Sequence, residues 1–255
     1  MTARVAVLVF PGTNSEEETR DLLLDCGADA RIVHWSESAS LAYYDAFVLP
    51  GGFAYEDRIR AGAIAAHDAM LDVVIEAAQA GKLVMGICNG AQILLEAGLV
   101  PGSGEIRRPT AAFTHNAQGH FICERVLLRR TVAAERCAIA AALPEDALIP
   151  AWAAHGQGRL AASAAHLEEI ERGGHVVFRY ADARGATDAH LAPQGSALGA
   201  AALTNREGNV LAIMPHPERD AWNFNHLDRR EGADVLAPSG GSVLFRSFVT
   251  ALERW

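Results

Sequence analysis

The sequence predicts an α/β fold: a doubly wound, mainly parallel sheet flanked by helices, in a single domain over residues 1–255. The first observation is that short apolar runs alternate with segments of helical periodicity through the first hundred residues. Only short loops containing Gly or Pro separate them, which implies right-handed crossovers between parallel strands. The second observation is the length of 255 residues with 50% hydrophobic residues, which is ample for one buried core.

The N-terminal half supplies most of the parallel strands. Ser15 and Glu18 have the spacing of a capping box, so a helix is expected from there to Cys26. Continuous apolar runs are typical of strands that are buried on both faces. The strands expected here cover residues 5–10, 30–34, 46–49 and 83–87, and two further helices cover residues 61–80 and 92–97.

The C-terminal part is less regular. The Gly and Asn residues within 205–209 predict a hairpin loop between two strands. The expected strands cover residues 121–128, 175–180, 197–204 and 210–214, and the expected helices cover residues 161–172 and 243–253. Residues 103–159 show little other periodicity, but no repeat or linker-like stretch divides the chain, which supports one domain.

Charge and cysteine usage exclude several classes of function. The chain has 22 Lys+Arg against 31 Asp+Glu, a net charge of −9 that neither nucleic acid nor an anionic membrane attracts. Four cysteines without a CxxC pair predict a reduced, cytoplasmic protein. The apolar run at residues 5–10 is too short for a signal peptide, and no run approaches the roughly 20 residues of a membrane helix. We therefore expect no nucleic-acid partner and no membrane partner.

The sequence also lacks the usual signatures of a bound metal or nucleotide. No His/Cys spacing typical of a metal site occurs, and no glycine-rich phosphate loop that ends in Gly-Lys-Ser/Thr occurs either. We therefore expect that this chain itself binds no metal and no cofactor.

Gly86-Ile87-Cys88-Asn89-Gly90 is the sharpest motif. It lies between an apolar strand and a helix and has the Gly-x-nucleophile-x-Gly form of a nucleophile elbow. Such a turn strains the backbone of the nucleophile, so its flanking positions must lack side chains. The turn also places Cys88 at a helix N-terminus, where free N–H groups stabilise negative charge. A small buried cysteine in an ordinary turn is the alternative, and the flanking strand and helix favour the nucleophile.

A cysteine nucleophile needs a base, and Met214-Pro215-His216-Pro217-Glu218 offers one. The prolines favour an extended segment, in which His216 and Glu218, two residues apart, face the same pocket. A carboxylate beside a histidine orients it as a general base. Taken alone, this segment is better explained as a solvated loop with an incidental His and Glu.

Pro50-Gly51-Gly52 follows a strand in the same half of the chain. Backbone without side chains there can present N–H groups to a developing oxyanion, together with the N–H of Asn89. Taken alone, this segment is better explained as a plain loop. It supports an oxyanion hole only in combination with the other two motifs.

In combination, the three motifs resemble the class I, triad-type glutamine amidotransferases. The resemblance implies that Cys88 is the nucleophile, that His216 is the general base and acid, and that Glu218 orients His216. In that family the cysteine attacks the side-chain amide of glutamine. A thioester forms, ammonia leaves, and water then releases glutamate.

The same resemblance assigns three supporting residues. Gly52 and Asn89 would supply the N–H groups of the oxyanion hole, and Gln92 would help to hold the substrate. Three positions depart from the pattern of the narrower family described next: Glu56 replaces a glycine, Gln157 a glutamate, and Ala192 an asparagine. None of these positions is in the triad, and no docking or substrate-pocket role is assigned to them.

Further segments resemble the glutaminase subunits of phosphoribosylformylglycinamidine synthase, an enzyme of de novo purine biosynthesis. Other triad amidotransferases usually carry a different residue after the nucleophile and lack the Phe-x-Tyr that follows Gly52. The matching segments are residues 50–55 with Asp57, Arg60 and 62–65, then 86–90, 154–156, 194–196, 208–211 and 214–219.

This resemblance implies two partner subunits. The chain would hydrolyse glutamine and pass ammonia to a large synthetase subunit, with a small adaptor subunit in the same complex. The synthetase would use ATP and Mg to convert formylglycinamide ribonucleotide to formylglycinamidine ribonucleotide. Two alternatives stay open: a DJ-1/PfpI-like cysteine hydrolase or thiol sensor, which shares the elbow, and a non-catalytic binding subunit in which Cys88 is a structural thiol.

Overall fold

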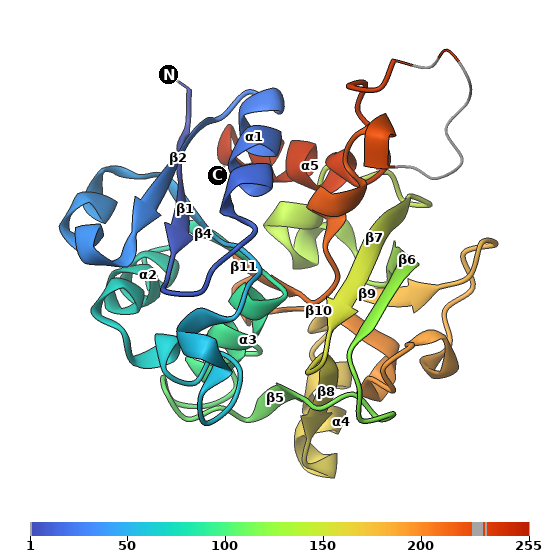
Figure 1. Cartoon of the computed structure of the whole chain (residues 1–255). Helices are drawn as coiled ribbons and strands as arrows, with labels where there is room; N and C mark the ends of the chain where they lie inside the picture. The colour runs from blue at the N-terminus through green and yellow to red at the C-terminus, as the bar shows by residue number, and fades with distance from the viewer. Residues whose placement is uncertain (1, 226–231, 233, 255) are drawn as a thin grey trace.

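A nine-stranded sheet forms the centre of the computed structural model, which describes residues 2–225, 232 and 234–254 (Figure 1). In spatial order its strands are β2 (Asp29–His34), β1 (Arg4–Val9), β3 (Ala46–Leu49), β4 (Leu83–Ile87), β11 (Val210–Ile213), β10 (Ala200–Thr204), β9 (Val176–Ala181), β6 (Ile122–Arg130) and β7 (Leu148–His155). A separate pair joins β5 (Ala111–Thr114) to β8 (Arg159–Ala162).

The two halves of the sheet differ in strand direction. The strands from β2 to β11 pair in parallel. The strands from β10 to β7 continue the sheet with antiparallel pairings. The predicted α/β fold with a mainly parallel sheet is confirmed, and the antiparallel strands extend it on one side. The predicted hairpin loop between β10 and β11 is confirmed as well.

Helices cover both faces of the parallel half. α1 (Glu16–Asp25) connects β1 to β2, α2 (Ala69–Gln79) connects β3 to β4, and α3 (Asn89–Glu96) follows β4 (Figure 1). The chain moves across the sheet in one direction from β1 to β2 and in the other from β3 to β4. Right-handed crossovers therefore place α1 and α2 on opposite faces, which is the doubly wound arrangement. α5 (Ser242–Leu252) packs against α1.

The helix predicted over residues 61–80 is wrong in its first half. The α-helix begins only after Asp68, whose carboxylate accepts a hydrogen bond from the N–H of Met70 at 2.8 Å. Gly62 has a φ of +81°, and a Cβ there would lie 2.7 Å from the backbone N of Ile93. This close approach to α3 requires a left-handed glycine and an irregular chain before the helix.

The capping box predicted for α1 does not form. Ser15 is the N-cap residue, but its hydroxyl makes no side-chain capping bond. It accepts instead a hydrogen bond from the guanidinium of Arg219 at 2.8 Å. A tertiary contact with the far end of the chain therefore replaces the local one.

Within residues 103–159 the sequence predicts only one strand, over residues 121–128. The structure has two further strands in this region, β5 and β7. β5 is short, and β7 carries Pro150 in its interior, which argues against a central strand in a sequence reading. β7 is the edge strand of the sheet, where a proline without an N–H is tolerated. The predicted helix over 161–172 shortens to α4 (Ala164–Arg172), because residues 159–162 form β8 and the Ser163 hydroxyl caps the helix through the N–H of His166.

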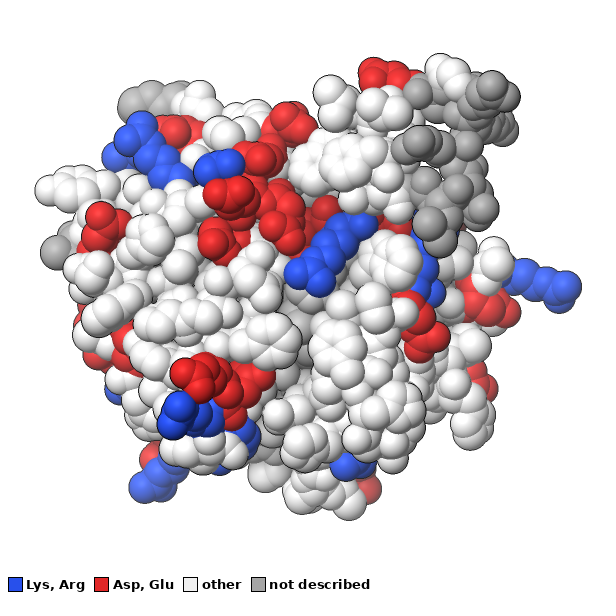
Figure 2. All heavy atoms as spheres, viewed as in Figure 1, with Lys and Arg blue, Asp and Glu red and all other residues white. Residues whose placement is uncertain are grey.

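The surface is rich in acidic groups. Figure 2 shows carboxylates gathered over α1, whose first turn carries Glu16, Glu17 and Glu18. No helix within the described ranges is long and apolar enough to cross a membrane. The fully buried strands β3 and β4 lie beside β11, so the carboxyl ends of these three strands meet at one edge of the sheet. Loops at this edge are where ligands bind in open α/β sheets.

Candidate active site

The turn between β4 and α3 presents Cys88 at the carboxyl edge of the sheet. Cys88 has φ 51° and ψ −104°, a strained conformation for a residue with a side chain. A Cβ on Gly90 would lie 2.0 Å from the carbonyl oxygen of Leu49, and one on Gly86 would lie 2.6 Å from Gly90. The close packing of this turn explains both glycines, and the predicted strand-to-helix elbow is confirmed.

His216 lies across from this turn, just beyond β11. Its backbone N–H donates to the carbonyl of Trp152 at 2.8 Å, and the N–H of Trp152 returns a bond to the carbonyl of His216 at 3.0 Å. Its Nδ1 lies 2.5 Å from Oε1 of Glu218, and both side chains are buried. The sequence predicted an extended segment through Glu218, but residues Pro217–Asp220 form a 3-10 turn. The two side chains still meet, because the turn brings the carboxylate back to the ring.

The electrostatics of the site favour a charged His216. Burial by itself lowers the pKa of this imidazole, but the negative charges of Glu218 and Cys88, together with hydrogen bonds to both, outweigh burial and raise the pKa. Because Glu218 occupies Nδ1, the other ring nitrogen, Nε2, is the one available for exchanging a proton with Cys88 or a substrate.

The loop after β3 lies against the same turn. The carbonyl of Pro50 accepts the N–H of Gly90 at 3.2 Å, which joins the two loops. Gly52 has a φ of +151°, and a Cβ there would lie 2.6 Å from Cα of Thr13. A Cβ on Gly51 would lie 2.5 Å from Cε1 of His216, so the second glycine of this loop makes room for the imidazole. The role of Gly51 is missed by sequence reasoning, which singles out Gly52 alone.

The Asn89 side chain holds this loop in place. Its Oδ1 accepts the N–H of Ala54 at 2.9 Å, and its Nδ2 donates to Asp57 at 3.1 Å and to Oε1 of Gln92 at 2.9 Å. Asn89 is also the first residue of α3, where a backbone N–H has no acceptor within the helix. One residue therefore fixes the position of the loop and offers an N–H beside Cys88.

Gln92 bridges two loops of the site. Its Oε1 accepts from Asn89, and its Nε2 donates to the carbonyl of Gln157 at 2.6 Å. Both ends of its amide are thus bonded within the chain. Gln157 makes this contact through its backbone, so the identity of its side chain does not matter to it.

The other two departures from the family pattern also have simple surroundings. Glu56 has a φ of +59°, the left-handed region that explains why glycine is usual there. Its carboxylate lies on the surface beside Arg58, at 2.9 Å. Ala192 is buried, and its carbonyl accepts the N–H of Gly195 at 3.0 Å.

These loops enclose a small pocket with a volume of about 100 Å³. Four of the predicted site residues line it, while Asn89 and Glu218 lie directly behind its wall. The lining residues are Asn14, Gly52, Phe53, Asp57, Cys88, Gln92, Phe121, Ala154, His155, Gly156, His216 and Arg219. Asp57 and Arg219 lie within the segments that carry the family resemblance but were given no role in the site. Burial raises the pKa of Asp57, and the hydrogen bond from Asn89 partly offsets this.

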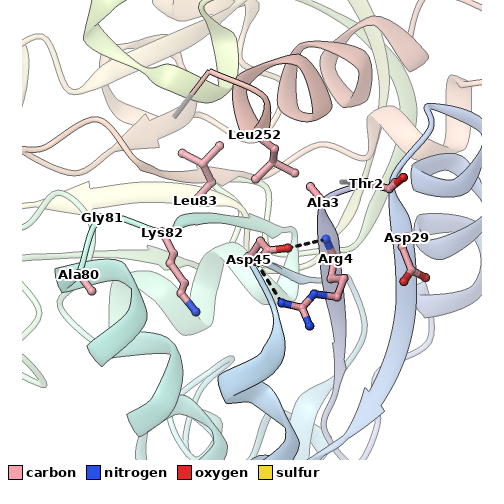
Figure 3. A pocket seen from close by; sticks show the side chains of 10 residues that line it. All are labelled: Thr2, Ala3, Arg4, Asp29, Asp45, Ala80, Gly81, Lys82, Leu83 and Leu252. Carbon is pink, nitrogen blue, oxygen red and sulfur yellow. Dashed lines mark hydrogen bonds and ion pairs between the residues drawn. The ribbon is translucent and has the colours of Figure 1, made fainter.

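A much larger hollow of about 900 Å³ lies at the opposite edge of the sheet (Figure 3). Arg4, Asp45 and Lys82 are among its lining residues, and none of the predicted site residues is. Nowhere in residues 2–225, 232 and 234–254 do three or more His, Cys, Asp or Glu side chains gather as they would around a metal ion.

Comparison with known proteins agrees with this geometry. A family model described as a CobB/CobQ-like glutamine amidotransferase domain matches residues 2–250. The chain is 40% identical over 250 residues to phosphoribosylformylglycinamidine synthase subunit PurQ of Symbiobacterium thermophilum, covering 98% of this chain and 97% of the relative. It is 43% identical over 220 residues to the subunit of the same name from Trichormus variabilis, covering 85% of this chain and 88% of the relative.

A solved structure of PurLQS from Thermotoga maritima contains a similar chain. The two superpose with a TM-score of 0.76 at 30% identity, covering 98% of this chain and 99% of that one. The match to the family model spans nearly all of the sequence, including the elbow and the His–Glu segment. The chain therefore belongs to the family of CobB/CobQ-like glutamine amidotransferase domains.

Proposed function

We propose that this chain is the glutaminase subunit of a phosphoribosylformylglycinamidine synthase. The observation that carries the proposal is the buried Cys88–His216–Glu218 arrangement at the pocket, in a chain whose relatives over nearly full length are subunits of that enzyme. The alternatives of a DJ-1/PfpI-like hydrolase and of a non-catalytic subunit are not favoured, because the amidotransferase family match covers residues 2–250.

The first half of the reaction uses the triad. Cys88 gives its proton to Nε2 of His216 and attacks the side-chain carbonyl carbon of glutamine, so that an S–C bond forms and the carbonyl oxygen takes negative charge. The N–H groups of Gly52 and Asn89 stabilise this oxyanion, an effect worth about 3–4 kcal/mol per donor in related sites. His216 delivers its Nε2 proton to the amide nitrogen, the C–N bond breaks, and ammonia leaves with a thioester behind it.

The second half releases glutamate. A water molecule gives a proton to His216 and attacks the thioester carbon, the S–C bond breaks, and His216 returns the proton to the Cys88 sulfur as glutamate leaves. Glu218 holds the His216 ring throughout, because its carboxylate accepts the Nδ1–H and stabilises the charged imidazole. Gln92 helps to hold the substrate indirectly. Both ends of its amide bond to the pocket loops and keep them in position.

The partners follow from the relatives. Ammonia would pass to a large synthetase subunit that binds ATP and Mg, with a small adaptor subunit in the complex, and this chain would need no cofactor. The synthetase would convert formylglycinamide ribonucleotide to formylglycinamidine ribonucleotide in purine biosynthesis, in the cytoplasm. The support for an assembly is the likeness to a chain of the Thermotoga maritima PurLQS structure.

Reconstitution tests this function. The purified chain is mixed with the synthetase and adaptor subunits of the same organism, ATP, Mg and formylglycinamide ribonucleotide. We expect product formation from glutamine only when this chain is present, and product formation from ammonium salts without it. Glutamine-dependent synthesis that needs no added chain, or none when all subunits are present and ammonium salts work, would contradict the proposal.

A further inference from the structure

His155 lines the catalytic pocket and has a buried ring nitrogen without a hydrogen-bond partner among the described residues. It is the last residue of β7, it is 3% exposed, and it lines the same pocket as Cys88 and His216. Its Nε2 is buried and has no hydrogen-bond partner among the residues that the structure describes. Buried polar atoms without a partner are rare in folded proteins, and in a residue that lines a pocket a contact with a bound ligand is one explanation for such an atom.

Asn116 fixes which ring nitrogen of His155 carries the proton. The Asn116 amide nitrogen donates to the carbonyls of His155 at 2.8 Å and His120 at 2.9 Å, so its Oδ1 is oriented as an acceptor. This Oδ1 accepts the N–H of Gly158 at 3.0 Å and lies 3.2 Å from Nδ1 of His155. Nδ1 must therefore be the donor, which leaves Nε2 as a bare lone pair.

The charge state of the ring agrees with this assignment. Burial, and to a smaller extent the positive charge of His216, lower the pKa of His155 to about 4. The imidazole is therefore neutral at physiological pH.

The pocket consequently has two walls of opposite hydrogen-bonding character. Gly52 lines the pocket, and the N–H groups at the start of α3 lie beside Cys88, so donors are available in this part of the site. On the β7 side, the carbonyl of Ala154 lies 3.9 Å from the Cys88 sulfur. The next residue, His155, has the unpartnered Nε2, which is a second acceptor. A carboxamide fits between these walls, because it has one acceptor oxygen and two N–H donors.

We propose that His155 is a specificity-determining residue whose Nε2 accepts a hydrogen bond from the side-chain NH₂ of glutamine. The inference rests on the proposed glutaminase function and adds how the site distinguishes amide from acid. Glutamate would turn a second oxygen toward Nε2 and the Ala154 carbonyl, and lone pairs would then face one another. The pocket would thereby bind the substrate glutamine and disfavour the product glutamate.

The test compares two compounds that differ at this one position. Glutamine has the NH₂ group, whereas a glutamine-mimicking diazoketone has a diazomethyl carbon there and donates no such hydrogen bond. Three variants are assayed in the reconstituted complex: His155→Leu, which removes the acceptor, His155→Gln, which keeps an acceptor oxygen, and His190→Leu, an exposed histidine as the matched control. Labelling of Cys88 by the diazoketone reports whether the pocket is intact.

We expect His155→Leu to lower kcat/KM for glutamine by about 10- to 100-fold, the usual effect of losing one buried hydrogen bond. The rate of diazoketone labelling should change by less than about threefold, and inhibition by glutamate should strengthen relative to glutamine binding. His155→Gln should recover part of the loss, and His190→Leu should behave like the unmodified chain.

Two results would overturn the inference. A parallel loss of glutamine turnover and diazoketone labelling would show that His155 only maintains the shape of the pocket. An unchanged kcat/KM for glutamine in His155→Leu would show that Nε2 contacts no substrate group. If the unmodified chain itself neither uses glutamine nor labels at Cys88, the proposed function fails, which is a separate outcome.

Discussion

Two hollows lie at opposite edges of the parallel sheet, and the predicted site residues line the smaller one. The hollow at the amino ends of the strands has a volume of about 900 Å³, and the ion pair of Arg4 and Asp45 in it is about half exposed (Figure 3). The pocket at the carboxyl ends has a volume of about 100 Å³, and Cys88 and His216 within it are buried.

The two hollows also differ in how their polar groups are paired. At the amino edge, Lys82 donates to a backbone carbonyl and Arg4 pairs with Asp45, so these polar groups are satisfied. At the carboxyl edge, a non-glycine residue has positive φ at Cys88, and Nε2 of His155 lacks a partner within the described chain. Backbone strain clusters at functional sites, so the strain at Cys88 supports the smaller pocket as the active site.

The largest expected effect is that of removing the nucleophile. Cys88→Ala should reduce glutamine-dependent synthesis by about 10⁴-fold or more, because no thioester can form. Ammonia-dependent synthesis in the same complex should survive, since it bypasses this pocket. Loss of both activities would mean that Cys88 serves the complex in another way than as a nucleophile.

A smaller loss is expected when the orienting carboxylate is neutralised. Glu218→Gln should lower kcat by about 10²- to 10⁴-fold with little change in KM, because an amide can donate to Nδ1 and stabilise the wrong tautomer of His216. Steady-state kinetics with glutamine provide the measurement. A rise in KM at constant kcat would assign Glu218 to substrate binding.

Acidification should weaken the folded state through His155. Its pKa of about 4 in the fold lies below the ordinary value of 6.5, so between these values the unfolded chain binds more protons. The stabilisation is complete above about pH 6.5 and is lost as the pH falls toward 4. Between pH 7.5 and 5, the unmodified chain should lose on the order of 2 kcal/mol more than His155→Gln in urea unfolding. Equal losses would show that His155 is not held neutral.

The smallest effect is expected at the amino edge. Arg4→Ala should change the free energy of unfolding by about 0–1 kcal/mol, because exposed ion pairs contribute little. The backbone N–H of Arg4, which donates to Asp45 at 2.8 Å, remains in the variant. Glutamine turnover should be unchanged. A clear loss of turnover would give the larger hollow a function and break the contrast between the two edges.

Much of the parallel half could be predicted because its signals are local. The apolar runs and the glycines around Cys88 reflect burial and close packing within a few residues of each strand end. β7 and the irregular chain before α2 could not be predicted in this way. Pro150 is tolerated only because its strand is at the sheet edge, and Gly62 is required only because α3 lies against it.

The same distinction between local signals and long-range contacts applies to the site. The motifs single out Cys88, His216 and Glu218 because each lies in a distinctive short pattern, and the structure brings all three together. The contacts of Asn89 with Ala54 and Asp57, and the tautomer that Asn116 imposes on His155, arise between segments that are far apart in sequence. A pattern within one sequence gives no signal for such contacts.

The central claim is that Cys88 is a nucleophile poised for the side-chain carbonyl of glutamine, and site-mapped covalent labelling tests it most directly. Treatment with the glutamine-mimicking diazoketone should label Cys88 stoichiometrically, and glutamine should block the reaction. Cys123, which is exposed, is an internal control that should stay unmodified. Labelling of Cys123 in preference to Cys88, or no labelling even with the synthetase subunit present, would contradict the claim.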